Sequence, residues 1–165
     1  MDRLILMRHG DAERDSATGD DFDRRLSARG HEESARMGET LADLGLTPDL
    51  ALASSAVRTR ETWADVSAAF PKALARFEDS LYLADSQDIR TAAEAAGREA
   101  GSVMVVGHNP GLQELALTLL IEGSAPGSAL DRVRTGFPTS GAAVFLFDGM
   151  GRPHYDGLFW PRDRR

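Results

Sequence analysis

The chain has 165 residues, a length that predicts a single domain, residues 1–165, with room for a hydrophobic core. Its formal net charge of −7 argues against nonspecific binding to nucleic acid or to an acidic membrane, and 42% hydrophobic residues are ordinary for a globular protein. The absence of cysteine excludes disulfides and thiol chemistry, and the first apolar run is too short for a signal peptide or a membrane span, so we expect a cytoplasmic protein.

The first apolar run, residues 4–7, is followed directly by Arg8, His9 and Gly10. It predicts a strand buried on both faces, which ends by placing the arginine and the histidine at the edge of a sheet. Ligands bind at that edge in open α/β sheets, and Gly10 allows a turn or a close approach of a ligand. A short triplet is weak by itself, because Arg8 could be solvated and His9 could belong to the core.

The next segment, residues 11–25, is polar and rich in Asp and Arg, which predicts a loop at the mouth of a site. Within it, Arg24 or Arg25 could reach a phosphate, although a solvated run of charge explains them equally well. Ser27 then predicts the N-cap of a helix that stops at Gly45.

A second apolar run, residues 50–53, precedes Ser54, which can cap the following helix. Arg58 and Arg60 fall in the first turn of that helix, where a cation opposes the helix dipole. A local rule broken in this way often marks a functional site. The alternative is pairing with Glu61 or another surface acid, which we favour for Arg60.

A third run, residues 102–107, also ends at a histidine, His108. We expect Asn109 to be the N-cap and Pro110 the first residue of the next helix. If this strand and the first are parallel neighbours, His9 and His108 face each other across one crevice, near a helix N-terminus that attracts an anion.

Strand-like and helix-like segments alternate along the whole chain, with further strands expected at residues 73–77 and 142–147 and a helix at 86–100. This alternation predicts an α/β fold: a three-layer αβα sandwich with a mostly parallel central sheet, helices on both faces and a last strand paired antiparallel.

Three elements in order, Arg8-His9-Gly10, Ser54 with Arg58, and Gly107-His108, resemble the motifs of the histidine phosphatase superfamily (phosphoglycerate mutase-like). Within it, the chain is most similar to the small SixA-type phosphohistidine phosphatases, because it also has Asp11-Ala12, Leu26-Ser27 and Asn109-Pro110 at matching places. The resemblance runs from residue 3 to about residue 148.

The resemblance implies that His9 is a nucleophile that forms a phosphohistidine, while Arg8, Arg58 and His108 bind the phosphoryl oxygens. It implies a reaction without a metal ion or other cofactor. The residues that we expect to contribute to substrate binding are Gly10, Ser54, Asn109 and Arg24.

Many superfamily members protonate the leaving group with a carboxylate located between the second arginine and the second histidine. The candidates here are Glu78, Asp79 and Asp85, none in a distinctive motif, and SixA-like proteins lack the usual glutamate. A phosphohistidine substrate tolerates that absence because its P–N bond is labile, whereas a phosphate monoester needs the acid.

Only 108 − 58 = 50 positions separate Arg58 from His108, which leaves no room for an inserted cap domain and predicts a shallow, open site. Our first hypothesis is a phosphatase acting on phosphohistidine of a signalling protein, such as a histidine phosphotransfer (HPt) domain. The second is a small-molecule phosphomonoesterase or phosphoglycerate mutase-like enzyme, favoured if Glu78 or Asp79 lies beside His9. The third is a non-catalytic module that binds phosphoproteins.

Overall fold

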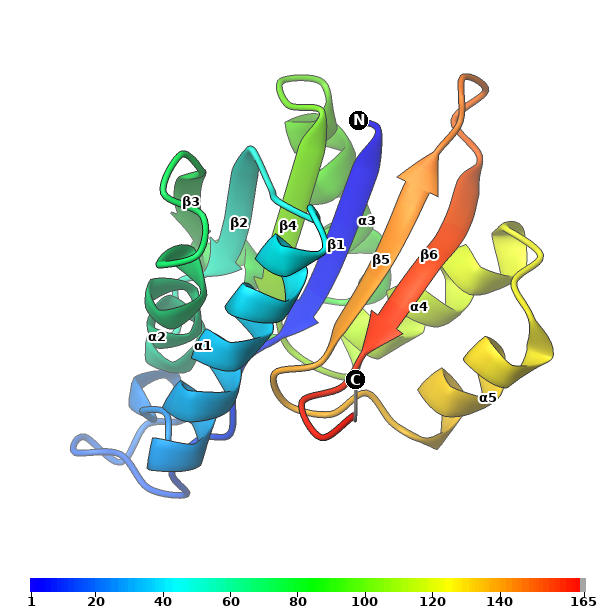
Figure 1. Ribbon diagram of the computed structural model, residues 1–165. Coiled ribbons are helices and arrows are strands. Elements are labelled where there is room, and N and C mark those ends of the chain that lie inside the picture. The colour runs from blue at the N-terminus through cyan, green and yellow to red at the C-terminus, as the bar shows by residue number, and fades with distance from the viewer. Residues whose placement is uncertain (164–165) are drawn as a thin grey trace.

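A central six-stranded sheet with helices on both faces organises the computed structural model, which describes residues 1–163 (Figure 1). The expected α/β sandwich with a mostly parallel sheet is confirmed. Residues 164–165, the end of the expected single domain, lie outside the described residues. Among residues 1–163, no helix is long and apolar enough to cross a membrane.

The strand order is β3-β2-β4-β1-β5-β6, and β3, β2, β4 and β1 are parallel. β5 pairs antiparallel with β1, as expected, and the final strand β6, which was not expected, pairs antiparallel with β5. β6 therefore runs in the same direction as β1, and β5 is the one strand of the six that runs against the others. The strands are β1 Arg3–Arg8, β2 Leu50–Ser54, β3 Leu74–Glu78, β4 Ser102–Gly107, β5 Ala142–Phe147 and β6 Pro153–Phe159.

The helices divide between the two faces of the sheet, α1 and α2 on one face and α3, α4 and α5 on the other. The α-helices are α1 Ala28–Asp43, α2 Val57–Ser67, α3 Ser86–Gly97, α4 Gly111–Glu122 and α5 Gly127–Thr135, and two short 3-10 turns are η1 Asp21–Asp23 and η2 Asp79–Leu81.

The central strand β1 supplies side chains to both layers of the core. Leu4 and Leu6 pack with α3, α4 and α5, while Ile5 and Met7 pack with α1 and α2. This alternation follows from the two-residue period of a strand, and burial on both faces explains why β1 is a continuous apolar run. Arg8 and His9 therefore begin where the strand leaves the core.

Of the three expected N-caps, one is confirmed and two are wrong. Ser27 caps α1, because its hydroxyl accepts a hydrogen bond from the Gly30 backbone N–H. Asn109 does not cap α4: its side-chain amide donates to the Phe137 carbonyl, and the helix begins at Gly111. Ser54 does not cap α2 either, since the helix starts after Ala56.

Candidate active site

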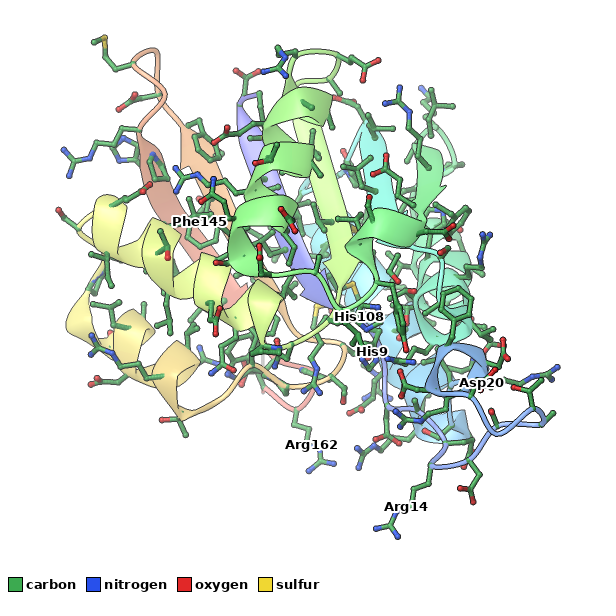
Figure 2. The ribbon with its side chains drawn as sticks, turned by 180° about the vertical axis from the view of Figure 1, so that it is seen from behind. His9, Arg14, Asp20, His108, Phe145 and Arg162 are labelled. Atoms are coloured by element: carbon green, nitrogen blue, oxygen red, sulfur yellow. The ribbon has the colours of Figure 1, made fainter. Side chains whose placement is uncertain are left out.

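His9 and His108 lie side by side at the carboxyl edge of the sheet (Figure 2). The parallel register of β1 and β4 pairs Arg8 with Gly107, so each histidine follows its strand at the same level. Their ring centroids are 5.2 Å apart, and the residues are 7% and 2% exposed. The expected convergence of the two imidazoles at one crevice is therefore confirmed.

The backbone fixes the proton on the His9 ring. Its Nδ1 lies 2.7 Å from the carbonyl oxygen of Gly10, and a carbonyl can only accept, so Nδ1 carries the proton in the neutral ring. This tautomer leaves a free lone pair on Nε2. Gly10 is held in turn by its N–H, which donates to the Thr62 hydroxyl at 2.9 Å.

His108 has the opposite tautomer. Its Nδ1 lies 3.4 Å from Nη2 of Arg58, and a guanidinium can only donate, so Nδ1 accepts. Nε2 then carries the proton and donates to the Ser54 hydroxyl at 2.8 Å. Ser54 thus orients the second imidazole from behind.

Burial and neighbouring cations keep both imidazoles neutral. Desolvation is the largest cause that lowers the pKa of His9 to about 3, and the positive charges of Arg58 and Arg8 lower it further. Desolvation also lowers the pKa of His108 to about 3, with His9 and Arg58 as the next causes. At neutral pH, His9 therefore has the lone pair that a nucleophile needs.

Two guanidiniums flank the histidines, that of the buried Arg58 and that of the half-buried Arg8. Arg8 donates from Nη1 to the Phe137 carbonyl at 3.0 Å, and its pKa is lowered by burial and by the nearby Arg58. Arg58 donates from Nη1 to the backbone carbonyl of Asp21 at 2.8 Å. The Nε atoms of both arginines are buried and have no hydrogen-bond partner among the described residues. This concentration of donors favours an anion.

The polar loop contributes a carboxylate that the sequence analysis did not single out. Asp21 accepts from the Arg58 guanidinium at 3.0 Å, from Arg24 at 3.0 Å and from the Tyr82 hydroxyl at 2.5 Å. The hydrogen bond from Tyr82 is the largest cause that holds the pKa of Asp21 well below its usual range. Asp21 is therefore an ionised acceptor that positions Arg58.

Tyr82 is a second residue that the sequence analysis missed. Its ring packs edge-on against His108, with centroids 5.4 Å apart, and also packs edge-on with the Phe22 ring, with centroids 5.0 Å apart. Asp21 and Tyr82 are 61 positions apart in the chain. No local pattern in the sequence could have revealed this pair.

These groups surround a cavity of about 420 Å³. Of the expected residues, Arg24 and Asn109 line it with the two histidines and Arg8 and Arg58, whereas Gly10 and Ser54 lie behind the imidazoles. The full lining comprises Arg8, His9, Asp11, Ala12, Asp21, Arg24, Arg58, Leu83, His108, Asn109 and Thr139.

The expected acids do not line this cavity. Glu78 ends β3, Asp79 accepts a hydrogen bond from the Ser55 hydroxyl, and Asp85 caps α3. The carboxylates in the lining are instead those of Asp11 and Asp21. Asp11 is bound by the Ser27 hydroxyl at 2.7 Å and by Arg29 at 3.1 Å.

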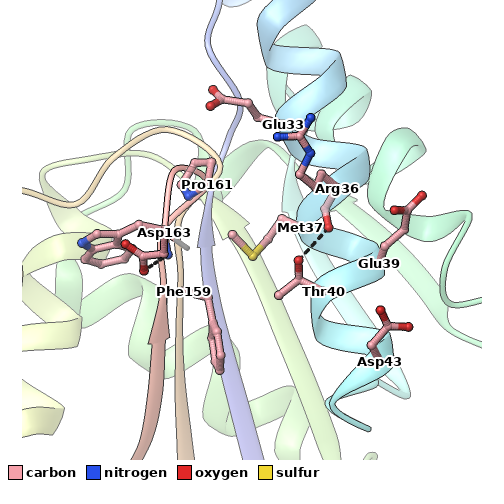
Figure 3. A pocket seen from close by; sticks show the side chains of 10 residues that line it. Glu33, Arg36, Met37, Glu39, Thr40, Asp43, Phe159, Pro161 and Asp163 are labelled. Atoms are coloured by element: carbon pink, nitrogen blue, oxygen red, sulfur yellow. Dashed lines mark hydrogen bonds between the residues drawn. The ribbon is translucent and has the colours of Figure 1, made fainter. Parts of the chain in front are cut away.

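A second pocket, of about 300 Å³, lies between α1 and the segment that follows β6 (Figure 3). Met37, Phe159 and Pro161 give it an apolar part, and Glu33 and Asp163 are at its rim. It shares no lining residue with the cavity around His9. The groups described above therefore do not extend into this second pocket.

Comparison with known proteins gives consistent matches. The model of the histidine phosphatase superfamily (branch 1) matches residues 4–81. The structure of the proposed phosphohistidine phosphatase SixA from Agrobacterium tumefaciens is 31% identical, with a TM-score of 0.84 over 97% of this chain and 98% of that one.

The chain belongs to the histidine phosphatase superfamily. A second structure of a proposed SixA, from Nakamurella multipartitia, is 28% identical with a TM-score of 0.83 over 98% of this histidine phosphatase and 97% of that chain. An uncharacterized chloroplastic protein of Arabidopsis thaliana is 31% identical over 96% of this chain and 78% of its own length.

Family and fold make this histidine phosphatase a metal-independent hydrolase of phosphoryl groups. The absence of an inserted cap is also explained by the fold. Between Arg58 and His108 the chain forms only the rest of α2, then β3, η2, α3 and β4, all of which belong to the sandwich. This segment therefore adds no cap over the cavity.

Proposed function

We propose that this enzyme removes the phosphoryl group from phosphohistidine in a signalling protein of the HPt type, through a phosphohistidine intermediate at His9. The observation that carries the proposal is the combination of a neutral imidazole with its free lone pair on Nε2, two adjacent guanidiniums, and a cavity lining from which Glu78, Asp79 and Asp85, the carboxyl groups expected to act as the acid, are absent. Such a site suits a leaving group that departs easily.

In the first step, Nε2 of His9 attacks phosphorus as the P–N bond of the substrate breaks. The substrate imidazole leaves as a neutral ring when its other nitrogen carries a proton. In the second step, water attacks the phosphorus on His9, releases inorganic phosphate and restores the free imidazole. Arg8 and Arg58 bind the phosphoryl oxygens throughout, and stabilising this charge is the main task of the protein in phosphoryl transfer.

The remaining groups have supporting roles in this proposal. His108 gains a proton as the dianion enters and donates from Nδ1 to a phosphoryl oxygen. Arg24 and Asn109 line the entrance and bind the outer oxygens. Gly10 and Ser54 act through the histidines, by fixing the tautomer of each ring.

A comparison of three substrates tests the proposal: a phosphohistidine protein, a phosphoserine peptide and phosphoglycerate. We expect prompt release of phosphate from the first and little from the other two. The variant His9→Ala should lose activity by several orders of magnitude and should no longer trap labelled phosphate, because the nucleophile is gone. His154→Ala, an exposed histidine paired with Asp148, is the matched control and should behave as the parent.

Other outcomes distinguish the alternatives. Fast turnover of phosphoglycerate with none of phosphohistidine would make the enzyme a small-molecule phosphomonoesterase or mutase. Tight binding of phosphate with no labelled intermediate and no turnover of any substrate would indicate a module that only binds phosphoproteins.

A further inference from the structure

Leu83 is the one large apolar residue among the described residues that line the cavity around His9. The rest of the lining is charged, polar or small, and is suited to a phosphoryl group. Leu83 is 56% exposed, so the hydrophobic core gains little from it.

The backbone at Leu83 has a φ of 52°, in the left-handed region. A side chain with a Cβ atom adopts this conformation only at an energetic cost, and leucine has no short polar group to compensate for it. Glycine or asparagine would fit the same backbone more easily. Neither burial nor backbone preference therefore explains a leucine at this position.

The conformation persists because the chain is held firmly on both sides. Leu81 is buried in the core, and the carbonyl oxygen of Ala84 packs against Gly111 so closely that a Cβ there would lie 2.1 Å away. Asp85 then caps α3 through the Asp88 N–H. Strain that is fixed by its surroundings in this way gathers at ligand-binding sites.

We propose that Leu83 is a specificity-determining residue that packs against the flat ring carrying the phosphoryl group. This inference rests on the proposed function, in which that ring is the imidazole of a phosphohistidine. Tyr82, the preceding residue, packs edge-on against His108, so the Leu83 turn adjoins the phosphoryl-binding groups. An apolar contact here favours an imidazole over a small, hydrated amine or a carboxylate-bearing metabolite.

The test compares two phosphoramidates that share a P–N bond, phosphoimidazole and phosphoramidate, of which only the first has a ring. In Leu83→Asn we expect kcat/KM for phosphoimidazole to fall about tenfold, the scale of a lost apolar contact. For phosphoramidate it should stay within about twofold, because that substrate makes no contact with Leu83. Inhibition by inorganic phosphate should not change.

Three variants complete the experiment. Leu83→Met keeps an apolar side chain and should retain the preference for phosphoimidazole. Leu83→Gly should lose that preference and melt at a higher temperature, since the left-handed backbone is then unstrained. Leu74→Asn alters a leucine that is 72% exposed on β3, outside the cavity lining, and should leave both substrates unaffected.

An equal fall for both substrates in Leu83→Asn would show a purely structural role and overturn the inference, as would no fall for either. Failure of the parent enzyme to hydrolyse phosphoimidazole, phosphoramidate or a phosphohistidine protein would instead overturn the proposed function, and the inference with it.

Discussion

At the scale of single residues, the two imidazoles of the site are held neutral, and this makes the stability of the folded chain depend on pH. Each is buried next to the other and next to two guanidiniums, so a proton on either ring is strongly disfavoured in the folded chain. The unfolded chain has no such restriction, and its histidines bind protons near pH 6.5.

Stability should therefore fall on acidification. Because the folded pKa values of His9 and His108 are depressed to about 3, their contribution is complete above pH 6.5 and is lost as the pH falls from 6.5 towards 3. We expect a slope of about 1 kcal/mol per pH unit for each histidine. Urea unfolding at pH 7, 6 and 5 measures this slope. His108→Ala should give a shallower slope, and an unchanged slope would contradict the assignment.

The carboxylate of Asp21 competes with an incoming phosphoryl group for Arg58. In Asp21→Asn we expect inorganic phosphate to bind several-fold more tightly, because a negative charge in direct contact with Arg58 is removed. The inhibition constant for phosphate measures this. Asp23→Asn is the control, since Asp23 accepts from Thr18 and does not line the cavity. Weaker binding would mean that holding Arg58 in place outweighs the repulsion.

At the scale of elements, the start of α4 joins two parts of the site. Gly111 begins this helix three positions after His108 and packs against the carbonyl of Ala84, next to Leu83. An added methyl group at Gly111 has no room, so the two segments would have to separate.

Gly111→Ala should therefore destabilise the fold by about 1–3 kcal/mol, as overpacking generally does. It should also lower activity, because His108 and the Leu83 turn both shift. Gly127→Ala at the start of α5 is the matched control: a Cβ there meets nothing within 4 Å, and the change should be neutral or slightly stabilising. Denaturant titration compares the two variants, and equal stability would contradict the close packing.

The elements were largely predictable from sequence, because β1, β2 and β4 are buried apolar runs that each stop at a functional side chain. The helix starts after β2 and β4 were not. Ser54 and Asn109 are good capping residues, yet their side chains bind His108 and the Phe137 carbonyl, partners that are distant in the chain. The roles of Asp21 and Tyr82 could not be predicted either, because these two residues are also distant from each other in the chain. The backbone strain at Leu83 could not be predicted because neither composition nor periodicity depends on it.

At the scale of the whole molecule, β1 couples the two layers of the core to the site. Leu6 lies in the core on the α3, α4 and α5 side, two residues before Arg8, and is fully buried. Leu6→Ala should lower the free energy of unfolding by about 2–5 kcal/mol, since the cavity cannot close between packed layers. Leu146→Ala on β5, a partly exposed position, should cost much less. Similar losses in the two variants would refute this account of the core.

The place of β1 in the sheet also has a consequence for synthesis on the ribosome. Arg8 and His9 leave the exit tunnel before Phe137 and Ser140, yet their backbone carbonyls accept from the Ser140 N–H, and the Arg8 side chain donates to the carbonyl of Phe137, 129 positions later in the chain. The nascent polypeptide thus contains the nucleophile His9 before it contains Phe137 and Ser140, the residues that hold Arg8 and His9 in place. Phosphatase activity can therefore appear only after Phe137 and Ser140 have been synthesised and β5 has paired with β1 in the sheet.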